Sequence, residues 1–296
     1  MKTLVIVGVA LLTLSVGTAN AAVRCAFAKT TIRGTARSDH LFGTPGRDVI
    51  RGFGGDDVIW GLDGVDTICG GSGDDVIHGG RAFDIAEGGA GRDKIHGGPG
   101  GDAVAGGWGA DVLFGGEGAD LMMDNQGSDF IRGGRGPDQV DGGAGADVYR
   151  LGRGDDVVNF EWAGVDTYYG GLGRDSFALG WAEGGNRIIG GAGWDRLVWE
   201  REGAVIIDLF AGTVDVGVGV DSIGRIEAAE GGPDDDTLIG SNIKNRLEGG
   251  RGDDHLEGRA GNDFLDAGPE PGDSVDGGDG TDECYSGGTI VNCELP

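Results

Sequence analysis

The stretch from Gly34 to Asn159 constrains the fold of this chain more than any other, because it divides without remainder into fourteen consecutive nonapeptides. Each nonapeptide is a variant of Gly-Gly-x-Gly-x-Asp-x-U-x, in which U is a large apolar residue. Position six is Asp in all fourteen, and position four is Gly in twelve, failing only at Arg37 and Ala82. An uninterrupted run of fourteen repeats predicts a repeat architecture in which each unit stacks on its neighbours.

Glycine accounts for 67 of the 296 residues, and it loses more backbone entropy on folding than any other residue. It does not recur at every third position, and the chain has only 7 prolines, so a collagen triple helix is excluded. The mature chain has no segment that combines helix caps with a 3.6-residue apolar period. We therefore expect an all-β repeat fold with a thin core.

The net charge of −27 argues against nucleic acid and anionic membrane surfaces as partners. Twenty-two of the fifty acidic residues are aspartates at or near position six of a unit, so the excess charge comes from the repeat itself. Like charges that recur this closely repel one another in a compact fold unless cations lie between them. The charge pattern therefore indicates a cation-binding repeat.

The first 21 residues have the features of a secretory signal peptide. Lys2 precedes an apolar run from Leu4 to Leu14, and residues 19–21 (Ala-Asn-Ala) form a small-x-small cleavage site. The apolar run is too short to span a bilayer, and no later segment resembles a transmembrane helix. We expect the mature protein to be secreted and extracellular, without membrane insertion.

Four cysteines, Cys25, Cys69, Cys284 and Cys293, fit an oxidising compartment. The sequence alone allows three pairings. Cys25 with Cys69 and Cys284 with Cys293 would staple the two ends of a rod, since two cysteines lie near each end of the mature chain. A zinc site is the competing interpretation, but no Cys-x-x-Cys spacing or nearby histidine supports it. We therefore expect disulfides.

The chemistry of one unit suits calcium, which takes six to eight oxygen ligands at about 2.3 to 2.6 Å from carboxylates and backbone carbonyls. Glycine at positions one, two and four permits positive φ, so the turn can direct carbonyls toward an ion without a Cβ clash. Asp at position six adds a short charged ligand. Positions seven to nine suffice for a very short strand whose position-eight side chain points inward. Two nonapeptides then form one coil, with two parallel sheets facing each other across a thin aliphatic core.

These units resemble a known family. Residues 70–78 (Gly-Gly-Ser-Gly-Asp-Asp-Val-Ile-His) and 88–96 (Gly-Gly-Ala-Gly-Arg-Asp-Lys-Ile-His) are similar to the calcium-binding nonapeptides of haemolysin-type RTX proteins. The resemblance covers about residues 34–198 and 231–285. It implies a right-handed parallel β-roll, a β-helix solenoid in which each calcium lies between the loop of one unit and the loop two units later.

On the pattern of that family, Asp75 and Asp93 would serve stacked loops on one edge of the roll, and Asp66 and Asp84 would do so on the other. Many family members carry a C-terminal export signal and an attached protease, lipase or pore-forming domain, whereas this chain has an N-terminal signal peptide and no such domain. Haemolytic or hydrolytic activity is therefore not implied. The chain resembles stand-alone calcium-binding proteins that some bacteria export.

The repeat divides the chain into six expected segments. These are a signal peptide (1–21), an N-terminal cap (22–33), a nonapeptide β-roll (34–198), a calcium-free β interruption (199–230), a second repeat block (231–285) and a C-terminal cap (286–296). The phase slips around Asp166, and again where Asn186 replaces Asp, and we expect bulges or outward loops there.

The candidate calcium ligands are the position-six aspartates of the better-matched units. They are Asp48, Asp57, Asp66, Asp75, Asp93, Asp102, Asp111, Asp120, Asp129, Asp138, Asp147, Asp156, Asp175, Asp195, Asp236, Asp254, Asp263 and Asp282. A solvated acidic face is the alternative, but it would not require glycine at fixed offsets from each Asp. Asp84, Asp166 and the Asn245 unit match the pattern less well.

Two other groups of residues invite a catalytic interpretation. His78 and His96 lie eighteen residues apart at position nine, but other position-nine residues are miscellaneous, so surface histidines are expected. Adjacent acids such as Asp56-Asp57 recur at the repeat period, so a ligand beside a loop acid accounts for them better than paired catalytic carboxylates do.

The sequence therefore predicts a secreted calcium-binding β-roll without catalytic residues, whose folding is coupled to Ca²⁺. A calcium-dependent adhesin or cell-envelope matrix component, with a glycan or envelope partner, is the first alternative. An RTX-type enzyme or toxin is the second. No segment outside the repeats exceeds about forty residues, which is small for a catalytic domain.

Overall fold

The computed structural model describes residues 29–159, 164–179, 184–199, 201–217 and 219–294. Its regular elements in those ranges are all β-strands. The expected signal peptide and Cys25 lie outside the described residues, so the cleavage site and the pairing of Cys25 with Cys69 stay predictions. No helix in the described ranges has the length and apolarity needed to cross a membrane.

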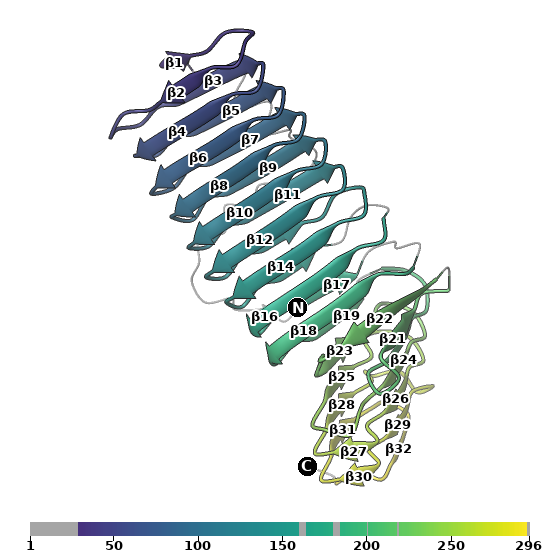
Figure 1. The fold of residues 1–296 in the computed structure, drawn as a ribbon. Helices are drawn as coiled ribbons and strands as arrows, with labels where there is room; N and C mark the ends of the chain where they lie inside the picture. Colours follow the sequence, from purple (N-terminus) through teal and green to yellow (C-terminus); the bar gives the residue numbers. More distant parts are fainter. Residues whose placement is uncertain (1–28, 160–163, 180–183, 200, 218, 295–296) are drawn as a thin grey trace.

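Two long sheets face each other and make up a solenoid (Figure 1). In order across the sheet, the 14-stranded sheet contains β1 (Ile32–Arg33), β3 (Val49–Gly54), β5 (Thr67–Ser72), β7 (Ile85–Ala90), β9 (Ala103–Trp108), β11 (Leu121–Gln126), β13 (Gln139–Asp141), β15 (Val157–Asn159), β17 (Ser176–Leu179), β19 (Arg196–Trp199), β23 (Ala228–Glu230), β25 (Arg246–Glu248), β28 (Phe264–Asp266) and β31 (Glu283–Tyr285).

The 16-stranded sheet is built from the intervening strands. In order across the sheet these are β2 (His40–Phe42), β4 (Val58–Asp63), β6 (Val76–Arg81), β8 (Lys94–Pro99), β10 (Val112–Glu117), β12 (Phe130–Arg135), β14 (Val148–Arg153), β16 (Thr167–Gly173), β18 (Arg187–Gly193), β22 (Val220–Gly224), β21 (Thr213–Asp215), β20 (Ile206–Asp208), β24 (Thr237–Ile239), β26 (His255–Glu257), β29 (Ser274–Asp276) and β32 (Thr289–Val291). A small third sheet pairs β27 (Ala260–Gly261) with β30 (Asp279–Gly280).

The register of the sheets follows from the nonapeptide period. Ile50 pairs with Ile68 in one sheet, and Ile59 pairs with Ile77 in the other, and both pairings are parallel. Because each coil holds two nonapeptides, equivalent positions stack directly on one another along the solenoid. The predicted all-β parallel β-roll is therefore confirmed, with about fourteen coils set by the 14-stranded sheet.

Position-eight side chains form the core, as the inward alternation of a strand requires. Ile50, Ile59, Ile77 and Ile95 are fully buried, and even the exceptional Ala86 is 2% exposed. The core is one residue wide on each sheet. Its aliphatic stack is therefore continuous but thin, and it leaves the turns to hold the two sheets together at their edges.

The strands of the first block are longer than the sequence predicts. Most have six residues, because pairing resumes after position one. In β3 and β5, for example, Arg51 pairs with Cys69, the next position is skipped, and Phe53 then pairs with Gly71. The skipped residue is the position-one glycine. The sheet ladder is thus broken at the first residue of each turn.

The interruption predicted between the repeat blocks is a small antiparallel insert within the 16-stranded sheet. β21 pairs antiparallel with both β20 and β22, whereas β20 returns to parallel pairing with β24. Figure 1 shows that the direction of the stack changes here, and the second block continues beyond it. At its end, a disulfide joins Cys284 to Cys293.

Candidate metal sites in the turns

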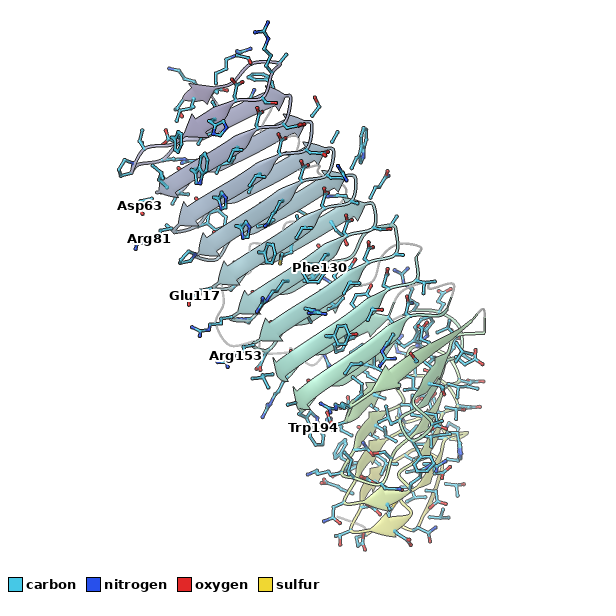
Figure 2. All side chains as sticks on the ribbon, viewed as in Figure 1. Asp63, Arg81, Glu117, Phe130, Arg153 and Trp194 are labelled. Atoms are coloured by element: carbon cyan, nitrogen blue, oxygen red, sulfur yellow. A yellow bond between two sulfur atoms is a disulfide. The ribbon has the colours of Figure 1, made fainter. Side chains whose placement is uncertain are left out.

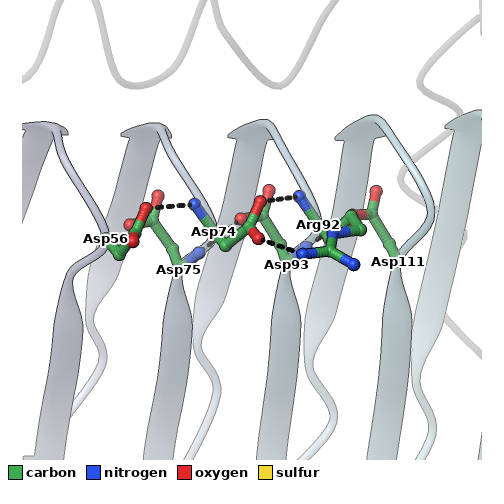
Figure 3. Close-up of polar contacts among 6 residues, drawn as sticks. All are labelled: Asp56, Asp74, Asp75, Arg92, Asp93 and Asp111. Atoms are coloured by element: carbon green, nitrogen blue, oxygen red, sulfur yellow. Dashed lines mark hydrogen bonds and ion pairs between the residues drawn. The ribbon is translucent and has the colours of Figure 1, made fainter.

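The position-six aspartates form one continuous hydrogen-bonded ladder along each edge of the solenoid. The backbone N–H of Asp57 donates to Oδ1 of Asp75 at 2.7 Å, and the same bond links Asp75 to Asp93 and Asp93 to Asp111, each at 2.8 Å. Figure 3 shows Asp75, Asp93 and Asp111 stacked coil over coil. On the other edge, the N–H of Asp66 donates to Oδ1 of Asp84 at 2.8 Å. The stacking that the family resemblance implied for these turns is thus present.

A second ladder runs in the opposite direction one residue earlier in the turn. The N–H of Asp74 donates to Oδ1 of Asp56 at 2.9 Å, and the N–H of Arg92 donates to Oδ1 of Asp74 at 2.9 Å. The Arg92 guanidinium also pairs with Asp74 at 2.8 Å. The position-five residues are exposed, whereas the position-six residues are buried. Adjacent acids such as Asp56 and Asp57 therefore face different environments and do not form a pair over one substrate.

The second carboxylate oxygen of position six has no hydrogen-bond partner in most turns. Seventeen such Oδ2 atoms are buried and unpartnered. They belong to Asp57, Asp66, Asp75, Asp84, Asp93, Asp102, Asp111, Asp120, Asp129, Asp138, Asp156, Asp175, Asp195, Asp254, Asp263, Asp273 and Asp282. Since a buried unsatisfied acceptor costs about 1–3 kcal/mol, and more when it is charged, an array of this size requires a positively charged partner.

The turns also leave a cradle of oxygen atoms beside each of these carboxylates. A Cβ added to Gly52 would lie 2.0 Å from Oδ2 of Asp57 and 2.5 Å from the carbonyl oxygen of Gly70. A Cβ added to Gly70 would lie 2.3 Å from Oδ2 of Asp75 and 2.7 Å from the carbonyl oxygen of Gly88. The carboxylate of one turn and the position-one carbonyl of the next coil thus converge on the same space, which glycine at position one leaves open in these two turns.

Burial shifts the acidity of these carboxyl groups strongly. Desolvation raises the pKa of Asp93 to about 7, and neighbouring aspartates add to the rise while a backbone hydrogen bond opposes it. The pKa values of Asp129 and Asp138 rise to about 8 for the same reasons. The folded turns therefore disfavour bare carboxylates, which is the electrostatic condition that a bound cation relieves.

Other position-six residues find their partners within the protein instead. Three of them are predicted ligands, Asp48, Asp147 and Asp236, and others are Asp39, Asp166 and Asn245. For Asp48, burial raises the pKa, but hydrogen bonds from Thr44 and Thr31 outweigh it, and the net shift is downward. The pKa of Asp48 is thus lowered, whereas the pKa of Asp93 is raised.

Asp124 is an acidic residue that the period did not single out, because it stands at position one, where glycine is usual. It is fully buried, and its carboxylate accepts a hydrogen bond from the Tyr149 hydroxyl. Oxygens of Asp124, Asp129 and Asp147 all lie within 4.8 Å of one another. A carboxylate at a glycine position is the signal that could have identified this cluster. Asp124 thus adds a third carboxylate to the stacked turns of Asp129 and Asp147.

The donor set of these turns fits calcium. It consists of carboxylate and carbonyl oxygens, with neither a thiolate nor an imidazole among the atoms that converge in the cradles. Hard oxygen donors of this kind suit calcium rather than zinc or copper. His78 and His96 lie on the outer face of the 16-stranded sheet, where their rings stack at 5.0 Å. They take no part in the turns.

One comparison with known proteins, that with family models, identifies the same repeats. The model of the RTX calcium-binding nonapeptide repeat (four copies) matches residues 33–68, 70–104, 88–122, 124–158, 162–177, 182–198 and 240–269. No curated protein matches the chain. A solved structure with similarity is the X-ray crystal structure of a hyperactive, Ca²⁺-dependent, β-helical antifreeze protein from an Antarctic bacterium, with 16% identity, a TM-score of 0.42 and coverage of 90% of this chain and 85% of that chain.

Proposed function

Because the chain belongs to the RTX calcium-binding nonapeptide repeat family, we propose that it is a secreted, non-catalytic calcium-binding β-roll whose folding is coupled to Ca²⁺. The observation that carries this proposal is the array of seventeen buried Oδ2 atoms without partners. Removing a carboxylate from water is costly unless an opposite charge compensates it. The array therefore needs positive charges bound along the whole roll.

The residues that would hold calcium are the position-six aspartates, through Oδ2, and the position-one residues, through their carbonyl oxygens. Bound calcium supplies the positive charge that neutralises the stacked carboxylates. The chain itself supplies the geometry, because the two ladders of hydrogen bonds fix Oδ1 and leave Oδ2 directed at the neighbouring coil's carbonyl. Calcium affinity and correct coil stacking are thus properties of the same contacts.

Coupling to folding follows from the weakness of the other interactions. The core is mainly a single row of position-eight side chains on each sheet, while the 67 glycines raise the entropy cost of folding. Binding free energy then contributes directly to folding free energy. At extracellular calcium of about 1 mM, sites of the affinity usual for extracellular modules would be at least half filled.

A non-catalytic role is supported by the distribution of the acids. Most position-six carboxylates repeat the environment of their neighbours, with Oδ1 in the ladder and the residue buried, as at Asp66 and Asp84. A catalytic centre requires instead one site whose groups differ in protonation and exposure. The secreted location is supported by the signal-peptide features of residues 1–21.

Equilibrium dialysis against buffered calcium tests the proposed binding, with magnesium in excess as the competitor. We expect many calcium ions per chain, retained against magnesium, because the cradles offer several carbonyl and carboxylate oxygens to a large flexible cation. Loss of calcium under excess magnesium, or binding of only one or two ions, would contradict the proposal.

A calcium-dependent adhesin is the second candidate, and the outer face of the 16-stranded sheet favours it. From β2 to β18, positions seven and nine carry no carboxylate in a chain of net charge −27. Rings of Phe42, Trp60, His78, His96 and Phe114 stack one on the next along this face. Figure 2 shows the side chains projecting from it.

A groove of about 610 Å³ continues this face at β10 to β16 and is lined by Phe114, Arg132, Arg135 and Arg153, together with Glu117. Glu117 pairs with Arg135 at 3.1 Å. Arginines beside aromatic rings fit an anionic polysaccharide better than a neutral one. Calcium-loaded protein should then be retained on dextran sulfate but not on dextran, and replacing Arg132 and Arg153 by Gln should abolish the retention. Equal retention on both polymers would exclude this candidate.

A further inference from the structure

The turns fall into two kinds according to the partner of the position-six side chain. In the first kind, Oδ2 is buried without a partner, as in Asp57 and Asp75. In the second kind, the side-chain oxygen accepts hydrogen bonds from the same turn, as in Asp48. The two kinds differ in one backbone feature, the conformation of the residue at position two.

All seventeen turns with an unpartnered Oδ2 have positive φ at position two. Most of these residues are glycines, but four are not, and they hold φ values of 79° (Phe53), 82° (Leu62), 73° (Asn125) and 71° (Arg259). A side chain in this region costs about 1–2 kcal/mol. The conformation is therefore imposed on these turns, and it does not merely reflect the freedom of glycine.

Turns of the second kind have no positive φ at position two. Thr44 donates to Oδ2 of Asp48 from its backbone N–H at 2.6 Å and from its hydroxyl at 2.8 Å. Thr35 makes the same two bonds to Asp39, at 2.7 and 2.8 Å. Ser241 makes them to Oδ1 of Asn245, at 2.6 and 3.0 Å. Each of these side chains is thus clamped by its own turn.

The sign of φ matters because it sets the orientation of the peptide between positions one and two. The N–H and C=O of one peptide point in opposite directions, and turning the peptide over changes the sign of φ at the following residue. In one orientation the N–H reaches the position-six oxygen. In the other it points away, and the carboxylate is left facing oxygen atoms, as Asp57 faces the carbonyl of Gly70.

One glycine separates the effect of orientation from that of the hydroxyl. Gly232 lacks positive φ, and its N–H donates to Oδ2 of Asp236 at 2.6 Å. The peptide orientation alone therefore provides the partner in this turn, and a Thr or Ser hydroxyl adds a second bond in the others. Gly143 also lacks positive φ, but its N–H approaches the Tyr149 hydroxyl and not Asp147, so the Asp147 side chain is not clamped by its own turn.

We infer that the peptide orientation at position two decides which turns take a calcium ion, an inference that rests on the calcium-binding function proposed above. Turns with positive φ at position two bind the ion, and this assigns ligand roles to Asp84 and Asp273. Clamped turns need no ion, so Asp48 and Asp236 hold none. The first coil, which contains Thr35 and Thr44, is accordingly closed by protein donors alone.

Asn245 provides the design of the test. It shows that an amide replaces the carboxylate within a clamped turn, since its Oδ1 accepts both Ser241 bonds and its Nδ2 donates to the carbonyl of Glu227 at 3.1 Å. Asp48→Asn should therefore be tolerated without loss of an ion. Asp57→Asn, near the same end of the solenoid, removes a charge from a turn that the inference assigns to calcium.

The measurement is calcium bound per chain, by elemental analysis of protein equilibrated in buffered calcium, with far-UV circular dichroism as the check on folding. We expect Asp48→Asn to match the wild-type stoichiometry and Asp57→Asn to lose at least one ion. Asp236→Asn and Asp254→Asn form a second matched pair, stacked on one edge, in case Asp57→Asn does not fold.

Equal losses within a pair, or no loss from either Asp57→Asn or Asp254→Asn, would overturn the inference while leaving calcium binding intact. A wild-type chain that binds no calcium would overturn the proposed function itself. The two failures are thus distinguishable. Independently of calcium content, Asp57→Asn should increase the folded β signal of the calcium-free protein, because it removes a buried unpartnered charge, whereas Asp48→Asn should not.

Discussion

Acidification should restore structure to the calcium-free protein, because protons can replace calcium as the neutralising partner of the turns. The pKa of Asp93 rises to about 7 in the folded state, from an ordinary value of 3.8, chiefly through desolvation by burial. The folded state therefore binds more protons than the unfolded state between these two values. Stability must fall as pH rises through this window, which is opposite to the usual behaviour of a salt-bridged aspartate.

The size of the effect follows from the shifts. At about 1.4 kcal/mol per tenfold change, a carboxyl group shifted as far as that of Asp93 destabilises the fold by roughly 4 kcal/mol once it is charged. We halve this to about 2 kcal/mol, because water and counterions screen charges near the edge of a solenoid. Asp84, Asp129 and Asp138 are shifted at least as far. Together the four groups cost roughly 8 kcal/mol, which is comparable with the whole stability of a typical domain.

The assay is urea unfolding followed by far-UV circular dichroism, on protein stripped of calcium with a chelating resin, since EGTA loses affinity in acid. We expect a larger β signal and a cooperative urea transition at about pH 5, and little folded signal at about pH 8. Asp93→Asn serves as the control variant, and it should increase the folded signal at the higher pH and stabilise the fold less at the lower one. A folded signal that rises with pH, or one that does not depend on pH, would refute the reasoning.

Two further predictions concern the calcium-loaded fold. Ile95→Ala should destabilise the loaded protein by about 2–5 kcal/mol, because Ile95 is fully buried between Ile77 and Leu113. Thermal unfolding measures this loss, with Lys94→Ala on the exposed face as the control, and equal effects of the two substitutions would argue against a position-eight core. Leu62→Gly should stabilise the loaded protein by about 0.5–1 kcal/mol. Leu62 holds φ at 82°, and relief of this positive φ exceeds the entropy cost of the added glycine. A lower urea midpoint for Leu62→Gly would show that the Leu62 conformation carries no strain.

The period of the sequence is sufficient to predict the coil, the stacking and the core. Ile77 and Ile95 are separated by two nonapeptides, and the structure pairs them directly. The same spacing places Asp75 beside Asp93. These features depend only on where a residue falls in the repeat, and a repeated backbone must place equivalent residues in equivalent surroundings.

The orientation of single peptides could not be predicted in this way. Asp84 matches the consensus poorly because Ala82 stands at position four, yet Ala82 adopts φ of 78° and Asp84 is placed like its neighbours. Phe53 likewise adopts the conformation expected of glycine, whereas Gly232 does not. Contacts with the adjacent coils set these orientations, and one-dimensional spacing carries little information about them.

Tyr149 shows a second limit of sequence reasoning. It occupies position eight, and the period correctly places it in the core. Its hydroxyl nevertheless reaches Asp124 and Asp147 in the turns. An aromatic ring is long enough to join the core to the turn edge, and only the three-dimensional structure reveals which carboxylate it meets.

The most direct test of the central claim is a calcium titration followed by far-UV circular dichroism at neutral pH and constant ionic strength. If binding and folding are coupled, the calcium-free chain will give the spectrum of a largely unfolded protein, and the β signal will appear cooperatively as calcium rises toward about 1 mM. Magnesium at the same concentration will not produce it. A full β spectrum in the absence of calcium, unchanged by the titration, would contradict the account.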